Sequence, residues 1–433
     1  MRLLADTTPL RTSQFRRLWA AGVPTVIGAN LTIFAVPVQI YSLTENSAYV
    51  GLAGLFALVP LVVFGLLGGA WADAMDRRVL LILASCGLAV ASLLLWLQAV
   101  FSFNNVWVVL CLLAFQQAFF AVNAPTRSAA IPRMLPGSEL PAANALNMTV
   151  TQFGAIAGPL LAGVLLNWVN LSTLYLIDTI TCLAPIWATY RLAPMPAGVH
   201  PDADGASRWG MRAVFDGLRY LAGHTVVLMS FVADLIAMIF GMPRALFPQI
   251  AHQSFGGPVG GGSEMALLAA AMSVGAVAGG VFSGWLPRVR RQGMAVMVAI
   301  VAWGVAMVGF GLASGQAHGH AGPLLWAALV FLALGGAADM VSSAFRQTIL
   351  QQAASDEVVG RLQGVFTVVV GGGPRVADAV HGAAGAVIGT SAAAAGGGAL
   401  VVLGVGMAAF AAPAFIRYRS PEVVSRRDHQ QGT

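Results

Sequence analysis

Long apolar stretches follow one another along almost the whole chain, separated by short polar connections. Most of them have about 20 residues, which is enough for a helix to cross a hydrocarbon layer about 30 Å thick. Because a bilayer offers the backbone no water to bond with, uninterrupted apolar stretches of this length are expected to be helices. The pattern therefore predicts an all-α membrane protein.

Twelve spans can be drawn, six in each half of the chain. The first half gives Leu18–Tyr41, Tyr49–Trp71, Val79–Phe101, Val106–Ala130, Pro141–Leu166 and Thr173–Tyr190, and the second gives Thr225–Ala251, Met265–Leu286, Gly293–Leu312, Pro323–Ala344, Val359–Ile388 and Gly398–Ile416. We expect an N-terminal six-helix bundle at 1–191, a cytoplasmic linker with an amphipathic helix at 192–224, and a C-terminal six-helix bundle with a cytoplasmic tail at 225–433.

Arginines alternate with the spans in a way that predicts the topology. The connections after odd-numbered spans contain no arginine, whereas the N-terminus, the connections after even-numbered spans and the C-terminal tail are rich in it. By the positive-inside rule, both termini are predicted to be cytoplasmic. The first span follows Arg11, Arg16 and Arg17 and continues to full length, so we expect a transmembrane helix there and not a cleaved signal peptide.

Composition narrows the possible functions. The chain has 433 residues, of which 58% are hydrophobic and 9% charged, whereas soluble domains are about 25% charged. The net charge of +6 comes from arginine alone, and in so apolar a chain this basicity reports topology, so no nucleic-acid partner is expected. Without lysine there is no Walker A sequence, and no hydrolase or metalloprotease motif occurs. We therefore expect neither an enzyme nor a bound cofactor or metal.

Two parts of the chain repeat each other. The charged patch Gly69–Arg78 has a counterpart in Ser283–Arg291, about half the chain later, and Arg127 and Arg346 stand at equivalent places in the two halves. Both copies have the same orientation relative to their spans. The repeat therefore predicts two parallel halves related by an axis along the membrane normal.

The first patch resembles a signature of the major facilitator superfamily, G-x-x-x-D-R-x-G-R-R, between the second and third helices. Gly69, Asp73, Arg77 and Arg78 match it, whereas Ala74 and Asp76 depart from it. The resemblance implies the two-bundle major facilitator fold with twelve transmembrane helices. It also implies a cytoplasmic gating latch formed by Gly69, Asp73, Asp76, Arg77, Arg78 and Arg127; the alternative is an ordinary charged loop.

The fifth span carries G-A-I-A-G-P-L-L-A-G, which resembles the signature of the antiporter branches of that superfamily. Gly154, Gly158 and Gly163 would let helices approach backbone to backbone, and Pro159 removes a hydrogen bond within the helix. The resemblance predicts a moving seam in an exporter. Plain glycine-mediated packing is the other interpretation.

Ionisable residues at membrane depth are costly and need a partner or a wet cavity. The candidates are Asp234, Arg244, Asp339, Arg375 and Asp378, with Asp178 the weakest because it is predicted to lie close to the outer surface. A carboxylate that changes partner between two conformations can carry a proton across. We interpret the group as a proton-coupling site in which Arg375 pairs with Asp234 or Asp339; the alternative is a static ion pair.

Polar and aromatic side chains inside the spans are candidates for a substrate cavity. They are Asn30, Phe34, Gln116, Phe120, Gln152 and Trp303. Any one of them is more often a helix-packing contact than a ligand contact.

The segments A-V-P-V-Q-I-Y-S-L-T, at 35–44, and P-R-A-L-F-P-Q-I-A, at 243–251, resemble the bacterial enterobactin exporter branch of the superfamily. The resemblance implies a monomeric exporter in the inner membrane, moving a small hydrophobic or amphipathic, siderophore-like molecule outward by proton antiport and alternating access. Its partners would be the lipid bilayer, the substrate and protons. The alternatives are a broad multidrug efflux pump and a non-transporting membrane sensor or scaffold with the same fold.

Overall fold

The structure is a computed structural model that describes residues 6–195, 224–353 and 356–418. It does not describe the side chains at 66, 69, 70, 72–74, 225, 287, 351–353 and 356–368. The amphipathic helix expected in the linker falls outside the described residues.

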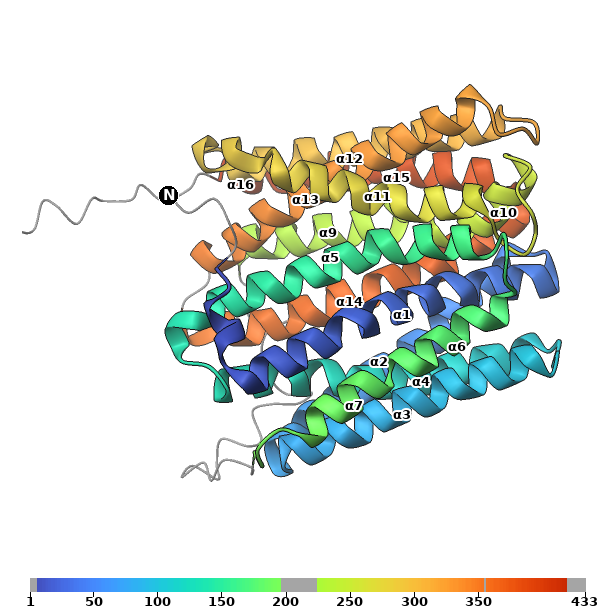
Figure 1. Ribbon diagram of the computed structural model, residues 1–433. Coiled ribbons are helices and arrows are strands. Elements are labelled where there is room, and N and C mark those ends of the chain that lie inside the picture. The colour runs from blue at the N-terminus through green and yellow to red at the C-terminus, as the bar shows by residue number, and fades with distance from the viewer. Residues whose placement is uncertain (1–5, 196–223, 354–355, 419–433) are drawn as a thin grey trace, which may run out of the picture.

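The chain folds into long helices that lie side by side (Figure 1), and the described residues contain no strand. In the first half these are η1 (Thr8–Arg11), α1 (Ser13–Thr44), α2 (Ser47–Ala74), α3 (Arg77–Val100), α4 (Val106–Ala130), η2 (Ile131–Arg133), η3 (Gly137–Glu139), α5 (Leu140–Leu165), α6 (Leu171–Thr181) and α7 (Leu183–Tyr190). In the second half they are α9 (Thr225–Gly241), η5 (Arg244–Leu246), α10 (Phe247–Gln253), α11 (Ser263–Val281), η6 (Ser283–Arg288), α12 (Gln292–Gly315), α13 (Pro323–Ala353), α14 (Asp356–Ile388), α15 (Thr390–Ala411) and α16 (Pro413–Ile416).

Eleven helical segments of the described chain are long and apolar enough to cross a membrane. The one remaining expected span, Val359–Ile388, corresponds to α14, which has 33 residues and runs beside the others. Arg375, Asp378, His381 and a run of glycines make this helix less apolar than its neighbours. The predicted all-α, twelve-span architecture is therefore confirmed, with α14 as its most polar member.

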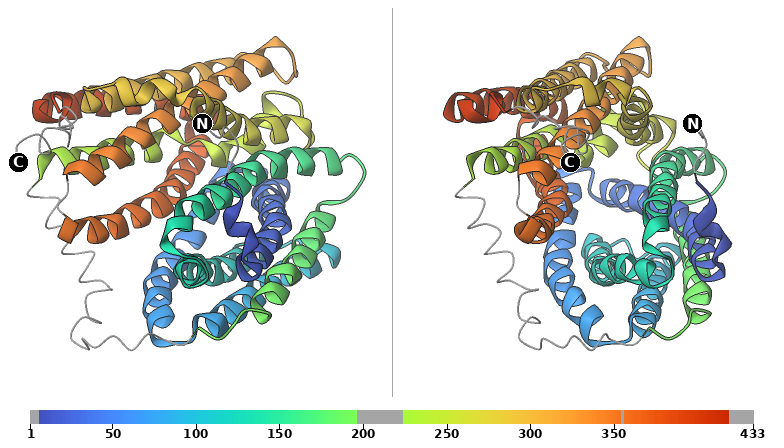
Figure 2. Two further views of the ribbon diagram at one scale, coloured as in Figure 1. Left: turned by 60° about the vertical axis from the view of Figure 1, so that its left-hand side comes forward. Right: turned by 90° about the vertical axis from the view of Figure 1, so that its left-hand side faces the viewer.

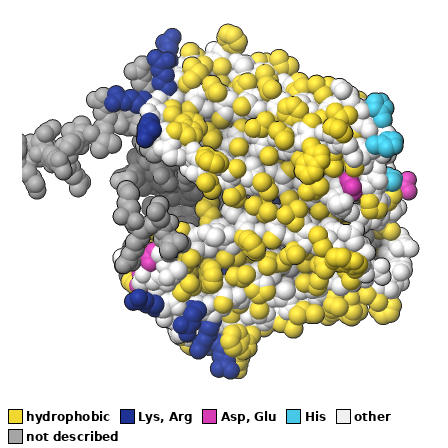
Figure 3. Space-filling model, turned by 45° about the horizontal axis from the view of Figure 1, so that its top comes forward, with side chains coloured by type: hydrophobic (Ala, Val, Ile, Leu, Met, Phe, Trp, Pro, Cys, Tyr) yellow, Lys and Arg dark blue, Asp and Glu magenta, His cyan; other side chains and the backbone are white. Residues whose placement is uncertain are grey.

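The two ends of the helix bundle differ in charge. Figure 3 shows arginines gathered at one end, histidines at the other, and a broad apolar belt between them. Large apolar side chains of the long helices are freely exposed, for example Phe410 on α15 at 91% and Val387 on α14 at 83%. We call the two ends the arginine-rich and the arginine-poor end; by the positive-inside rule the first is predicted to be cytoplasmic.

Two predicted spans are interrupted. The sixth is divided into α6 and α7 at Cys182, shortly before Pro185, and the seventh is divided at Met242 and Pro243 into α9 and the short helices η5 and α10. Proline removes a backbone donor and clashes with the preceding turn, so a helix cannot run through it undisturbed. The second break leaves carbonyl groups at the end of α9 to be satisfied by other helices.

The two halves meet along two pairs of helices, α2 with α14 and α5 with α11. In Figure 2 the helices of the first half, in blue to green, are arranged in a ring. The helices of the second half, in yellow-green to red, lie against one side of this ring. Glycines let the helices touch at both seams: a Cβ built on Gly51 would lie 2.8 Å from the Cα of Gly382, and one on Gly163 would overlap Ala266.

The described contacts across the halves are concentrated at mid-depth and toward the arginine-poor end. There Ser47 N donates to Gln249 Oε1 at 3.2 Å, the Tyr41 and His252 rings lie 6.2 Å apart, and Gly261 packs against Val38. The described contacts therefore join the halves at mid-depth and at the end opposite the arginines.

Candidate functional site

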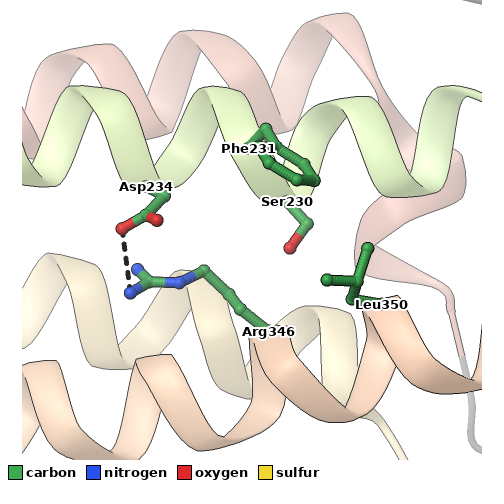
Figure 4. A pocket seen from close by; sticks show the side chains of 5 residues that line it. All are labelled: Ser230, Phe231, Asp234, Arg346 and Leu350. Carbon is green, nitrogen blue, oxygen red and sulfur yellow. Dashed lines mark ion pairs between the residues drawn. The ribbon is translucent and has the colours of Figure 1, made fainter. Parts of the chain in front are cut away.

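A buried ion pair lies between α9 and α13 in the second half of the chain. Arg346 Nη2 is 2.9 Å from Asp234 Oδ1, with side-chain exposures of 2% and 1%, and 3.8 Å from Asp339 Oδ1, whose side chain is 27% exposed. Figure 4 shows the Arg346 side chain reaching from α13 toward Asp234 on α9. One arginine thus faces two carboxylates with different access to their surroundings.

The pair is incompletely hydrogen-bonded. Neither oxygen of Asp234 has a hydrogen-bond partner of good geometry beyond the ion pair, nor does Arg346 Nε, whereas Arg346 Nη1 donates to Ser342 Oγ at 3.0 Å. A narrow pocket lined by Ser230, Phe231, Asp234, Arg346 and Leu350 adjoins the pair (Figure 4). A buried charge with unused hydrogen-bonding capacity gains from a proton or a new partner.

Arg346 is the partner that the sequence interpretation missed, since Arg375 was expected in that role. Instead, Arg375 Nη2 donates to Gln117 Oε1 at 2.9 Å, across the two halves, and Arg375 Nη1 donates to Gly371 O at 2.6 Å. The internal repeat had singled out Arg346 as the counterpart of Arg127, but its predicted place was the cytoplasmic end of the tenth span. Because α13 continues to Ala353, Arg346 lies inside the helix.

A second group of charged residues lies in the same half of the chain. Arg244, on η5 directly after the broken helix, interacts electrostatically with Asp339 and with Asp378. Arg375 also interacts with Asp378, three residues further along α14. Arg244 therefore links Asp339, and through it the Asp234–Arg346 pair, to the α14 charges.

The broken seventh span is held by two side chains from neighbouring helices. Trp303 Nε1, on α12, donates to Gly241 O at 3.0 Å, and His381 Nε2, on α14, lies 3.0 Å from Phe240 O. A carbonyl can only accept, so Nε2 carries the proton of His381. These bonds satisfy carbonyls that the break frees, and they place Arg244 at the start of a new helical segment.

The described latch residues have contacts within the first half. Asp76 caps α3 and accepts from the backbone N of Arg78 at 2.8 Å and of Met195 at 3.1 Å. Arg77 Nη1 donates to Ala129 O at 3.0 Å, and Arg78 Nη2 donates to Tyr190 O at 2.6 Å.

Arg127 Nη2 donates to Leu18 O at 3.3 Å, again within the first half. The surroundings of Gly69 and the side chain of Asp73 are outside the described part, so a latch across the two halves stays a prediction.

The glycines of the fifth span pack against two different helices, α1 in the same half and α11 in the other half. Cβ atoms on Gly154 and Gly158 would overlap Val26 and Asn30 of α1, whereas Gly163 faces Ala266 of α11 in the other half. Pro159 lies inside α5 between them. This one helix therefore packs closely on its own half and on the opposite half.

The predicted cavity residues are placed in different surroundings. Asn30 is bonded to Val26 O, Gln116 to Ser92, Gln152 is half-buried, and Phe120 is 47% exposed. Phe34 and Trp303 are 2% and 0% exposed and pack inside the protein. In this conformation those two rings belong to the core. The described residues contain no cluster of His, Cys, Asp or Glu that could hold a metal.

Comparison with known proteins places this architecture in a family. The model of the transmembrane secretion effector family matches residues 5–427. Among curated proteins, the chain is 26% identical over 402 residues to the enterobactin exporter EntS of Citrobacter koseri and 25% identical over 399 residues to that of Escherichia coli O139:H28, covering 90% of each chain in both cases.

Solved transporters share the fold at low sequence identity. The nucleoside transporter NupG superposes with a TM-score of 0.69 at 12% identity, covering 93% of this chain and 98% of that one. A bacterial homologue of the human lysosomal transporter Spinster, solved in an inward-facing and unoccupied conformation, gives 0.73 at 14%, covering 96% and 100%. With its apolar spans and helix arrangement, the chain is a multi-pass cell-membrane transporter that belongs to the transmembrane secretion effector family of the major facilitator superfamily.

Proposed function

We propose that this protein exports a small hydrophobic or amphipathic, siderophore-like molecule across the cell membrane in exchange for protons. The observation that carries the proposal is the buried Asp234–Arg346 pair with Asp339 as a second acceptor. The direction and the substrate class rest on the similarity to the enterobactin exporters.

Proton exchange follows from the competition for Arg346. A proton on Asp234 neutralises the carboxylate and removes its attraction for the guanidinium. Arg346 can then move fully onto Asp339, which it already approaches at 3.8 Å. Since Asp234 lies on α9 and Arg346 on α13, this change of partner loosens one helix contact, and deprotonation restores it.

The conformation supports a cavity that opens toward the cytoplasm. Described contacts between the halves concentrate at mid-depth and toward the arginine-poor end, as an inward-facing state requires. The narrow pocket at the ion pair includes Leu350, on the arginine-rich side of Arg346 along α13. In this state the pair would exchange its proton with the cytoplasmic side.

The test is proton-driven uptake of a catecholate siderophore into inverted membrane vesicles, with proton movement recorded at the same time. Asp234→Asn should lose most of its pH-driven uptake, because the carboxylate that competes with Asp339 for Arg346 is gone. The double variant Asp234→Asn/Asp339→Asn should lose it entirely, because neither carboxylate that faces Arg346 is left, and both proteins should still reach the membrane. Ser342→Ala removes a neutral partner of Arg346 and serves as the matched control, with transport largely retained.

Retained pH-driven uptake in the double variant would refute this coupling site. A wild-type protein that moves dyes and antibiotics but no siderophore would instead assign it to broad drug efflux. If the purified wild-type protein moves neither substrates nor protons, the result would favour a sensor or scaffold role over transport.

A further inference from the structure

A buried carboxyl group in the first half plays no part in the ion-pair mechanism. Asp178, on α6, is 1% exposed, and its Oδ2 accepts hydrogen bonds from Thr32 Oγ1 at 2.6 Å and Ser92 Oγ at 2.7 Å. The other oxygen faces Cys182 Sγ at 3.8 Å and the backbone of Gly28, where an added Cβ would lie 2.9 Å away. The structure thus holds this group tightly from α1, α3 and its own helix.

No cation accompanies Asp178 among the described residues. The titratable groups that interact with it electrostatically are Tyr175 and Cys182, both neutral as a rule and both on the same segment of the chain. Helices α1 and α3 face it with the neutral hydroxyls of Thr32 and Ser92. An ionised carboxylate inside a membrane protein without a counter-ion is costly, so this group is suited to hold a proton.

A polar cavity lies at the arginine-poor end of the first half, where loop residues such as Ser102 and Asn170 line it. This vestibule has a volume of about 470 Å³, and the residues that line it include Gln39, Ser42, Gln98, Asn104, Asn170 and Ser172. All of these residues belong to the first half, so the vestibule lies inside one bundle and apart from the seams between the halves.

A hydrogen-bonded triad includes two of the residues that line the vestibule, Gln39 and Gln98. The amides of Gln39 and Gln98 donate to each other at 3.1 and 3.0 Å, and Tyr175 OH donates to Gln39 Oε1 at 2.8 Å. Gln39 is seven residues from Thr32 on α1, which places the triad about 10 Å above the Asp178 layer. Between the two polar layers, Ala35 on α1 and Leu95 on α3 are both fully buried.

We propose that Asp178 is a second proton-binding carboxyl and that its proton exchanges with the arginine-poor side through the vestibule and the Gln39–Gln98–Tyr175 triad. A proton from water on that side crosses the thin apolar layer at Ala35 and Leu95 and forms an O–H bond with one carboxylate oxygen of Asp178; release reverses this step. The binding of the proton is independent of transport, whereas its use in export rests on the function proposed above.

The proton on Asp178 can be observed directly by pH-difference infrared spectroscopy of the full-length protein in lipid. The wild type should show the carbonyl band of a protonated carboxyl that is absent from Asp178→Asn. Thr32→Val and Ser92→Ala should shift the position of this band, because each removes a donor to the carboxyl group. Ser85→Ala is the matched control: Ser85 is also buried on α3, but its hydroxyl is bonded to Asn123.

Several results would overturn the site. The band could remain unchanged in Asp178→Asn, or shift equally in Ser85→Ala. Its loss on adding Na⁺ at constant pH would assign the site to a metal cation. Variants are compared only where size-exclusion profiles match the wild type, and Asp178→Glu, which keeps a carboxyl group, should retain a shifted band.

The route is tested separately by the rate at which the band responds to a pH jump. The double variant Gln39→Leu/Gln98→Leu should slow the response, whereas Gln116→Leu, which breaks the bond from α4 to Ser92, should leave it fast. The reverse pattern would show access from the α4 side and overturn the vestibule route. Loss of transport in Asp234→Asn with an intact Asp178 band would separate this site from the ion-pair site.

Discussion

Three buried or half-buried arginines differ in the groups that they bind. Arg346 is shared between Asp234 and Asp339, and Arg375 joins the halves through Gln117. Arg127, the repeat counterpart of Arg346, reaches the carbonyl of Leu18. The repeated position therefore keeps its cation in both halves, but the described structure gives only the second copy a carboxylate partner. This asymmetry is consistent with proton coupling in the second half.

Removing one partner of the Asp234–Arg346 pair should destabilise the protein more than removing both charges. Arg346→Gln leaves the Asp234 carboxylate buried without its cation, which costs about 3–5 kcal/mol. The double variant Asp234→Asn/Arg346→Gln should recover much of this loss. Thermal unfolding of detergent-purified protein measures the difference.

Acid should also rescue the single variant. A proton on Asp234 removes its unpaired charge, so the stability of Arg346→Gln should rise as pH falls and decline again as pH rises. The double variant should lack this added pH dependence. Equal destabilisation of the single and double variants at neutral pH would contradict an energetically important pair.

The sequence predicted where the helices lie much better than which side chains meet. Apolar runs of spanning length fix the helices because the bilayer demands them. The tenth span was ended at Ala344 because Arg346 and the glutamines after it lower its hydropathy, yet α13 continues to Ala353. Which side chains pair depends on their depth in the membrane and on the rotation of each helix. Because the predicted span stopped two residues before Arg346, the sequence interpretation placed this arginine at the cytoplasmic surface and not in the ion-pair site.

Glycine positions determine how closely individual helices approach one another. At the α2–α14 seam, a Cβ on Gly382 would lie 2.6 Å from both Gly51 Cα and Ser47 O. The seam lies beside the charged residues of α14, since a Cβ on Gly54 would overlap the carbonyl oxygen of Arg375. The close contact between α2 and α14 therefore also fixes the position of the charged residues on α14.

Gly382→Ala should weaken the α2–α14 seam. The added methyl group meets backbone atoms that cannot move away alone, and overpacking of this kind costs about 1–3 kcal/mol. Gly396→Ala, on α15, is the matched control, because a Cβ there meets nothing within 4 Å. Thermal unfolding should show a lower midpoint for the first variant and no loss for the second; equal midpoints would contradict a tight seam.

The whole molecule combines two bundles whose described contacts favour one end. The positive-inside rule predicts that this end faces outward, and the halves meet through α2 with α14 and α5 with α11. Both seams contain closely packed glycines. One bundle can therefore tilt against the other without the repacking of large side chains between them. Under the proposed alternating-access mechanism, we expect a second state in which the opposite end is closed.

Distances between spin labels on the two halves should reveal that second state. A cysteine pair at Ser138 and Arg288 reports on the arginine-rich end, and a pair at Asn104 and His320 on the arginine-poor end, in a background with Cys86, Cys111 and Cys182 replaced; all four label sites are exposed. Alternating access requires the two distances to change in opposite directions as substrate and pH are varied. Asp234→Asn/Asp339→Asn should make the populations insensitive to pH through this site. Distances that stay fixed at both ends, or that lengthen together, would rule out the rocking of rigid bundles.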